Sequence, residues 1–503
     1  RVRAPALPAD PARWLNTDTP LTLEALAGHV VVLDFWTYCC INCHHVLPEL
    51  AAIEERFADQ PVQVIGVHSA KFPREQERAA IELAVARHGI AHPVVSDPDR
   101  ALWSAFAVKA WPTVVVLDAT GREAWRQSGE VERATLSRVI ERLLGEAERA
   151  GTLADGGAPR RADAVAPGGG LRFPSKVHVQ PGLVAQARGA DPLADEAGAL
   201  WVADTGHHRV LECAIEVGDD GWPTAARVLR AFGGGPEGAA GFVDGGPGEA
   251  RFREPRGMSL HEGVLWVADT GNHALRAIDV ATGAVTTKAG TGRKGRGGRG
   301  DPTKPRSMDL RSPWAVEATD GAVFVAMAGT HQIWVYLPDR GHMGPMIGSG
   351  AEDHVDGLAR EAALAQPSGM ALFGGNLFWA DAETSSIRMA DLEQGQVMTV
   401  VGRGLFDFGD VDGAGDVVRL QHPLGVTVAA GGLWVADTYN HKIKSIDVQG
   451  GVTERVAGGD PSELREPDGI DALGSFLVVA DTGNHRLRVL DRTTGELRDL
   501  PVV

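Results

Sequence analysis

Cysteine is scarce in this chain, and its few cysteines are not spread along it. The 503 residues include 4 cysteines, and Cys39, Cys40 and Cys43 fall close together. A secreted domain held by disulfides needs several cysteine pairs distributed through the sequence. The pattern therefore argues against a disulfide framework and indicates chemistry at one place.

Long apolar runs and an excess of positive charge are also missing. No stretch of about 18 apolar residues occurs, so we expect no membrane-spanning helix. Residues 1–15 contain arginines but no apolar segment typical of a signal peptide, which favours a cytoplasmic protein. Because the chain starts at Arg1 rather than Met, an exported form with a removed leader stays open. The formal net charge of -17 argues against a nucleic-acid partner, because phosphate binding needs a basic surface.

Residues 1–150 alternate between strand and helix patterns. Nearly continuous apolar character predicts buried strands at 29–36, 62–67 and 113–118, and a short strand after a turn at Gly121. Amphipathic spacing predicts helices at 43–57, 75–87 and 133–149. This alternation predicts an α/β domain with helices on both faces of a sheet.

Two of the cysteines fall where the first strand passes into a helix. Backbone N–H groups at a helix N-terminus stabilise an anion, so a cysteine at this position has its thiolate favoured. A second cysteine three residues later lies one turn inside the helix and is able to close a disulfide on the first. We therefore expect Cys40 to be the nucleophile and Cys43 to be the resolving thiol.

The surroundings of this pair resemble the thioredoxin superfamily. The matching features are a carboxylate before the motif, an aromatic pair that leads into it, a proline after it and a later Trp-Pro-Thr segment: Asp34, Phe35–Trp36, Pro48 and Trp111–Thr113. The resemblance covers residues 10–150. An additional helix between Lys71 and His92 is similar to the insertion of the redoxin branch.

This resemblance implies a role for each matching residue. In the family the buried carboxylate takes the proton of the resolving thiol, which implies that role for Asp34. The family's cis-proline loop presents a strand edge to the substrate, which implies Pro112 in the active site. Trp111, Thr113 and Tyr38 are then the residues expected to contact the substrate.

The motif departs from that of thioredoxin. It has no proline between its cysteines, and Cys39 replaces an aromatic residue, as a small hydrophobe or as a partner in a mixed disulfide. Residues 40–44 also match a c-type haem attachment motif, which the strand–helix setting disfavours. Cys40, Cys43, His44 and His45 are zinc-ligand residue types, but consecutive helix positions cannot all point at one metal. We expect no cofactor and no metal. His44 is either an accessory cation beside the thiolate or an exposed helix residue.

The rest of the chain is a linker followed by repeats. Residues 151–170 are rich in Gly, Ala and Pro and predict a flexible linker. Residues 171–503 contain six copies of a unit typified by LWVADTGNHALRAID, with the Asp position at 204, 269, 327, 381, 437 and 481. Each copy has room for four antiparallel strands, which make one propeller blade. The units resemble NHL repeats, so the sequence predicts a six-bladed β-propeller.

The recurring Asp and His residues of the repeats invite a metal or catalytic interpretation. A residue that recurs in nearly every blade more simply serves the blade, because Asp side chains satisfy backbone N–H groups in turns. Met327 takes the Asp position in blade three, which predicts lost turn hydrogen bonds or a distinct surface there. Cys213, in blade one, is expected to be an inert thiol.

Together these patterns predict a multidomain protein, a thioredoxin-like α/β domain over 1–150 and an all-β propeller over 171–503. The predicted function is thiol–disulfide oxidoreduction by Cys40 and Cys43 on a protein disulfide or thiol substrate. The propeller is expected to recruit a protein partner on one face. The alternatives are an interaction scaffold with a non-catalytic thioredoxin-like module, or a peroxide sensor that uses Cys40.

Overall fold

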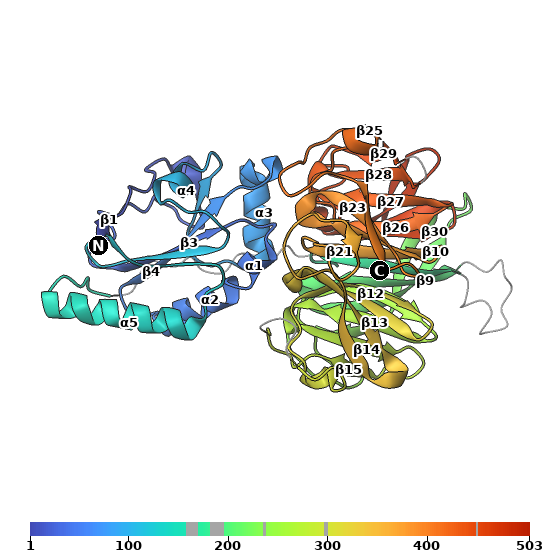
Figure 1. Cartoon of the computed structure of the whole chain (residues 1–503), viewed down its shortest axis with the longest axis horizontal. Helices are drawn as coiled ribbons and strands as arrows, with labels where there is room; N and C mark the ends of the chain where they lie inside the picture. Colours follow the sequence, from blue (N-terminus) through green and yellow to red (C-terminus); the bar gives the residue numbers. More distant parts are fainter. Residues whose placement is uncertain (157–169, 182–195, 235–237, 296–299, 449–450) are drawn as a thin grey trace. The chain divides into compact units, whose positions relative to one another are not determined.

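The chain divides into two compact units, Arg1–Ala166 and Pro167–Val503. The computed structural model describes residues 1–156, 170–181, 196–234, 238–295, 300–448 and 451–503 (Figure 1). The predicted linker, 151–170, lies mostly outside the described residues. Its first part still contacts the first unit: the N–H of Ala154 donates to the carbonyl of Gly28, and Leu153 packs against the core.

A mixed seven-stranded sheet forms the first unit. Its strands are β1 (Val2–Arg3), β2 (Trp14–Leu15), β3 (Val30–Trp36), β4 (Val62–Ser69), β5 (Val94–Asp97), β6 (Thr113–Leu117) and β7 (Arg122–Ser128). Their order is β1-β7-β6-β3-β4-β5-β2, with β3, β4 and β5 mutually parallel. The helices are α1 (Ile41–His44), α2 (Leu47–Arg56), α3 (Arg78–His88), α4 (Ala101–Ala105) and α5 (Arg133–Ala150).

Side chains of β3 alternate between two apolar cores, one on each face of the sheet. Leu33 and Phe35 enter one core, whereas Val30 and Val32 enter the core that also contains residues of α2 and α5. Because successive side chains of a strand point to opposite faces, Asp34 lies on the α2 and α5 side. The strand that delivers the cysteine motif therefore also buries a carboxylate.

The structure differs from the sequence prediction in the helix after the motif. One helix was expected over 43–57, but α1 ends at His44 and α2 begins at Leu47 with Pro48 in its first turn. Proline has no N–H to continue the helical ladder, which explains the break. The short elements β5 and α4 were not predicted. None of the helices among the described residues is long and apolar enough to cross a membrane.

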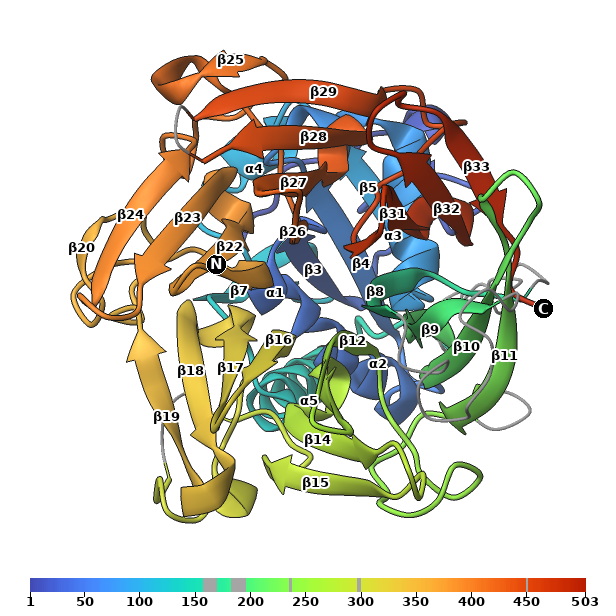
Figure 2. The ribbon, with the colours of Figure 1, turned by 90° about the vertical axis from the view of Figure 1, so that its right-hand side faces the viewer.

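The second unit is a six-bladed β-propeller (Figure 2). Blades one to three consist of β8 (Pro174–Pro181), β9 (Glu196–Asp204), β10 (Arg209–Val217) and β11 (Pro223–Gly233); β12 (Pro255–His261), β13 (Val264–Asp269), β14 (Ala274–Asp279) and β15 (Val285–Ala289); and β16 (Pro313–Thr319), β17 (Ala322–Met327), β18 (Gln332–Leu337) and β19 (His342–Ile347). Blades four to six consist of β21 (Pro367–Phe373), β22 (Asn376–Asp381), β23 (Ser386–Asp391) and β24 (Gln396–Val401); β26 (Gly425–Ala429), β27 (Gly432–Asp437), β28 (Lys442–Asp447) and β29 (Val452–Gly458); and β30 (Ile470–Leu473), β31 (Phe476–Asp481), β32 (Arg486–Asp491) and β33 (Leu497–Leu500). The two-residue strands β20 (Gly357–Leu358) and β25 (Gly413–Ala414) add to the outer edges of blades four and five.

The recurring Asp and His residues hold backbone segments in place. In blade two, Asp269 accepts the N–H of Arg253 at 2.8 Å, and four other blades repeat this bond. The repeated His bridges consecutive blades, as where Nδ1 of His208 accepts the N–H of Glu254 at 3.1 Å. His485 of blade six accepts the N–H of Phe173 at 3.1 Å, which joins the last blade to the first. The repeated residues therefore serve the fold, as predicted.

Blade three replaces a buried ion pair with an apolar pair. In blade two, Asp269 and Arg276 are fully buried and lie 2.7 Å apart. The corresponding residues of blade three are Met327 and Trp334, which are buried in one apolar cluster. An apolar pair of similar volume is often as stable as a buried ion pair, so the exchange of both residues together preserves the blade.

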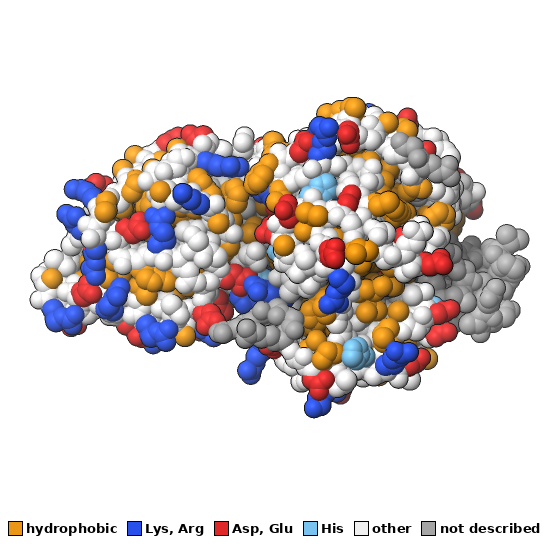
Figure 3. Space-filling model, in the orientation of Figure 1, with side chains coloured by type: hydrophobic (Ala, Val, Ile, Leu, Met, Phe, Trp, Pro, Cys, Tyr) orange, Lys and Arg blue, Asp and Glu red, His pale blue; other side chains and the backbone are white. Residues whose placement is uncertain are grey.

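On the face drawn in Figure 3, acidic and basic side chains are interspersed over both units.

We expect His485→Ala to weaken closure of the propeller, because it leaves the N–H of Phe173 without its acceptor. The loss of a bond to a partly buried donor predicts a decrease in unfolding free energy of roughly 1–3 kcal/mol. Urea unfolding measures this change, and hydrogen exchange of the 171–180 peptide locates it. His342→Ala, which changes an exposed histidine of β19, is the control. Equal losses in the two variants would contradict the role given to His485.

Candidate active site

The cysteine motif begins directly beyond the C-terminal end of β3. Cys40 is the N-cap residue of α1, with extended backbone angles, and its side chain is partly exposed. Cys43, one turn later, is fully buried, and its N–H donates to the carbonyl of Cys40 at 3.0 Å. Cys39 is also buried. One thiol of the motif is thus accessible to a substrate and the other two are shielded.

Burial raises the pKa of Cys43 well above its ordinary value. The hydrogen bond with the Cys40 thiol, the charge of Cys40 and the charge of Asp34 raise this pKa further. A thiol in this environment stays protonated in the resting protein, because a charged sulfur would be desolvated beside other negative groups. Cys43 therefore needs a base before it is able to act as a nucleophile.

Asp34 is the acid that lies behind the motif. Its carboxyl is fully buried, and neither oxygen has a hydrogen-bond partner among the described residues. Burial raises its pKa to about 7, and the charge of His92 opposes this shift. An acid with a pKa near neutrality both accepts and releases a proton readily.

A second pair of ionisable residues, His92 and Glu54, lies near this acid. Asp34 is the register partner of Gly66 on β4, and a Cβ at Gly66 would lie 3.3 Å from Nε2 of His92 and 2.9 Å from Nε1 of Trp36. The other ring nitrogen, Nδ1 of His92, lies 3.1 Å from a carboxylate oxygen of Glu54, whose side chain is 11% exposed. Glycine at position 66 leaves the room that these groups occupy.

The proline loop has the conformation that the resemblance implies. The Trp111–Pro112 peptide bond is cis. Nε1 of Trp111 donates to the carbonyl of Ser69 at 3.0 Å, and its partly exposed ring lies 4.3 Å from that of Trp103. The hydroxyl of Thr113 is buried and donates to the carbonyl of Ala110 at 2.7 Å, so it holds the loop from inside.

Two of the residues expected to contact substrate have buried side chains. Thr113 is fully buried, and the ring of Tyr38 is only 3% exposed, stacked on His68 at 5.5 Å. Burial lowers the pKa of His68 to about 3, so this ring stays neutral and packs like an aromatic residue. Trp111 alone of the three retains exposed surface. The sequence named Tyr38 as a substrate contact, but a sequence does not reveal which way the side chain of a turn residue points.

Cys39 and His44 make contacts in and around the turn that carries Cys40. The N–H of Cys39 donates to a carboxylate oxygen of Glu75 at 2.9 Å, and its sulfur lies 3.8 Å from the hydroxyl of Thr37. Nε2 of His44 donates to the carbonyl of Tyr38 at 2.9 Å. Both contacts fix the turn that carries Cys40. Cys39 thus occupies the site as a small buried side chain.

Glu75 is a residue that the sequence did not indicate. Its second carboxylate oxygen accepts the N–H groups of Lys71 and Phe72 at 2.8 and 3.0 Å. The same carboxylate therefore links the motif to the segment that precedes α3. His92 and Glu54 were missed too. Their only signal in the sequence is a charged residue inside apolar surroundings, which many surface residues share.

The fold and this site define a thioredoxin-like domain joined to an NHL-repeat β-propeller. The chain matches the thioredoxin-like family over residues 28–123 and the NHL repeat family over residues 420–444. It is 38% identical to NHL repeat-containing protein 2 of Gallus gallus over 471 residues, which cover 86% of this chain and 61% of that protein.

Two other relatives match different shares of the chain. Protein SUPPRESSOR OF QUENCHING 1, chloroplastic, of Arabidopsis thaliana is 38% identical over 480 residues, which cover 90% of this chain and 42% of that protein. Thiol-disulfide oxidoreductase ResA of Bacillus subtilis is 28% identical over 102 residues, which cover 20% of this chain and 54% of that protein. The chain spans about three-fifths, or less, of the length of these relatives.

We expect Asp34→Asn to stabilise the first unit at high pH. A carboxyl whose pKa rises from an ordinary 3.8 to about 7 on folding favours the native state below pH 4. That contribution is lost as the pH rises through 7, a change of about 4 kcal/mol. The variant should therefore be more stable than the natural protein at pH 8 and nearly equal to it at pH 4. Hydrogen exchange of β3 measures this, and a difference that does not depend on pH would contradict it.

Proposed function

We propose that this protein is a thiol–disulfide oxidoreductase that acts through Cys40 and Cys43. The observation that carries the proposal is the difference in burial among three residues of the site. Cys40 is partly exposed, Cys43 is buried, and Asp34 behind them is buried without a partner among the described residues. This arrangement separates an attacking thiol, a protected thiol and a base.

The reaction transfers two electrons from the cysteine pair to a substrate disulfide. The Cys40 thiolate attacks one substrate sulfur, which forms a mixed disulfide and releases the other substrate sulfur as a thiolate. Cys43 then gives its proton to the Asp34 carboxylate and attacks the Cys40 sulfur. The second substrate thiolate leaves, and the protein is left with a Cys40–Cys43 disulfide. A dithiol donor returns it to the reduced state. If an oxidant instead keeps the pair as a disulfide, the same steps run in reverse and a substrate dithiol is oxidised.

His92 and Glu54 extend this proposal to the path of the proton. Asp34 must return its proton to solvent before the next cycle, and it is buried. His92 lies over the register partner of Asp34 and contacts Glu54, which reaches the surface. We infer that the proton of Asp34 leaves through these two side chains.

The comparisons support the redox assignment and the association of the two units. One relative of the first unit is named a thiol-disulfide oxidoreductase. The relatives that match both units support a joint role for the domain and the propeller. We propose that the propeller recruits the protein whose disulfide or thiol the cysteine pair treats. Trp111, the loop residue with exposed surface, is then the expected contact for the substrate strand.

Cys43→Ser should trap a mixed disulfide between Cys40 and its substrate, because the resolving thiol is missing. Cys40→Ser removes the nucleophile and should abolish reduction of a model disulfide such as insulin. We expect the rate to fall by about 100-fold or more, as on removal of a catalytic group. Mass spectrometry of the 39–43 peptide identifies the trapped sulfur. Cys213→Ser is the control, since burial raises the pKa of Cys213 to about 12 and shields it.

A redox titration separates this function from a scaffold. Titration in glutathione buffers should give a reversible two-electron couple for Cys40–Cys43, and its midpoint tells whether the pair reduces substrates in the cytoplasm, the compartment that the sequence predicts. If no disulfide forms at any potential, and partner capture survives loss of both cysteines, the protein is a scaffold. Peroxide-dependent labelling of Cys40 without resolution would instead favour a sensor.

His92→Gln should slow release of substrate from the mixed disulfide at pH 7, by less than the roughly 100-fold or more that loss of a general base itself gives. The charge of His92 lowers the pKa of Asp34, so its removal leaves less carboxylate to accept the Cys43 proton. The pH profile of this step should move to higher pH in the variant. His29→Gln, before the opposite end of β3, serves as control. An unchanged pH profile would show that His92 only packs.

A further inference from the structure

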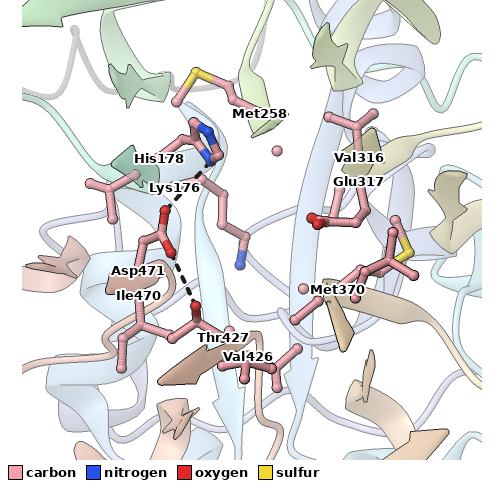
Figure 4. Close-up of a pocket in the computed structure, with 18 residues that line it drawn as sticks. Lys176, His178, Met258, Val316, Glu317, Met370, Val426, Thr427, Ile470 and Asp471 are labelled. Carbon is pink, nitrogen blue, oxygen red and sulfur yellow. Dashed lines mark hydrogen bonds and ion pairs between the residues drawn. The ribbon is translucent and has the colours of Figure 1, made fainter. Parts of the chain in front are cut away.

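A cavity of about 170 Å³ lies on the axis of the propeller (Figure 4). The inner strands of all six blades line it. Its polar groups come from positions two and four residues after a proline that recurs in every repeat. Sites for drug-sized ligands are larger, about 300 Å³ or more. The space suits a single small polar group on a short stem.

Lys176 closes one end of this cavity. The corresponding position is glycine in four blades and alanine in blade three, so only blade one has a long side chain here. Nζ of Lys176 donates to the carbonyls of Leu424 at 2.6 Å and Asp468 at 3.1 Å, and to the Asp468 carboxylate. All three N–H bonds of the ammonium are therefore directed at the protein. Lys176 gives the cavity a floor but offers no donor to a ligand.

Two residues after the position of Lys176, five of the six inner strands have a polar side chain that bonds to the next blade, and blade four has Ala371 there. Ser259 accepts the N–H of Ala318 at 3.0 Å, and His178 accepts the N–H of Leu260 at 3.2 Å through Nε2. A hydroxyl or an imidazole is thus enough for this structural role. A carboxylate at the same position has an additional oxygen and a charge that the role does not need.

Asp471 and Glu317 are the carboxylates at this position. Asp471 uses both oxygens: one accepts the N–H of Val179 at 2.7 Å, and the other accepts the hydroxyl of Thr427 at 3.0 Å. Nδ1 of His178, which carries the proton, lies 3.5 Å from it. Glu317 accepts the N–H of Leu372 and has no further hydrogen bond or ion pair among the described residues. Figure 4 shows it on the opposite wall from Asp471.

We propose that this cavity binds an organic cation, a guanidinium or alkylammonium group held between Glu317 and Asp471. The spare oxygen of Glu317 accepts its N–H bonds, and the charge of Asp471 attracts it across the cavity. A metal such as Ca²⁺ takes six to eight oxygen ligands, more than two carboxylates and a hydroxyl supply. The site lies wholly within the propeller and does not depend on the cysteine chemistry.

The state of Glu317 without a cation supports this assignment. Burial and the charge of Asp471 raise the pKa of Glu317 to about 8, while the Leu372 N–H opposes the shift. The other ionisable groups that line the cavity are His178, whose pKa is lowered by burial, and Lys176, which is paired with Asp468. A cation that enters therefore displaces a proton from Glu317. Binding should release protons at pH 7 and become tighter toward pH 8.

The test is calorimetry on the full chain with methylguanidinium and with a capped Gly-Arg-Gly peptide. Glu317→Gln keeps an oxygen for Leu372 and removes the charge, so it should weaken binding about tenfold or more. Glu317→Ser introduces the residue type that blade two has at this position, Ser259, which accepts the N–H of the next blade there. This variant should also weaken binding about tenfold or more. Asp320→Asn removes an exposed charge outside the cavity, from the turn after β16, and should leave binding unchanged. Cys40→Ser should also bind normally.

The outcomes distinguish the sources of the cation. If the peptide binds and methylguanidinium does not, a partner protein supplies the group; if methylguanidinium binds as well, a free metabolite is sufficient. Either result supports the proposal only if both Glu317 variants bind the probe more weakly than the natural protein does. Calorimetry in buffers of different ionisation enthalpy must also show that binding releases protons. If neither probe binds the natural protein at millimolar concentration, or Glu317→Gln binds equally well, the proposal is wrong.

Discussion

The removal of carboxylates from water is the constraint on which both units depend. A buried carboxylate is stable only when it is paired, hydrogen-bonded or protonated. The propeller meets this condition with partners: Asp269, for example, has Arg276, Asn272 and the N–H of Arg253 around it. Burial still raises the pKa of Asp269 to about 6, but its partners keep it ionised near neutrality. Such acids hold the blades and have no capacity left for chemistry.

Asp34 and Glu317 meet the same condition by taking up a proton near neutral pH. Each is held in an environment where the charged form lacks enough compensation, and the pKa of each moves to about 7 or 8. The fold tolerates this because protonation removes most of the cost. An acid that serves the structure therefore has a full set of hydrogen-bond and ion-pair partners. An acid that acts on a thiol or a ligand has fewer of them. Blade three makes the same point in reverse, since loss of the acid at Met327 is matched by loss of the cation at Trp334.

The sequence predicts those features that are local or periodic. The repeats fix the number of blades and the role of Asp269 and its counterparts, and the Cys40–Cys43 spacing fixes the position of the motif. Contacts between distant segments are not visible in the same way. Glu75 reaches Cys39 across 36 residues of chain, and His92 reaches Glu54 across 38. The burial of Tyr38 and Thr113 also depends on side-chain directions that one sequence does not encode locally.

The contact between Glu75 and Cys39 also explains how this motif is held without its proline. In thioredoxin-like motifs a proline between the cysteines stiffens the turn, because it fixes one backbone angle. Here Ile41 and Asn42 occupy those positions, and the carboxylate of Glu75 instead binds the N–H before the nucleophile. A bulky aromatic side chain in place of Cys39 would need room in the buried space beside Thr37. The small residue at position 39 and the acid at position 75 thus act together to hold the turn that carries the motif.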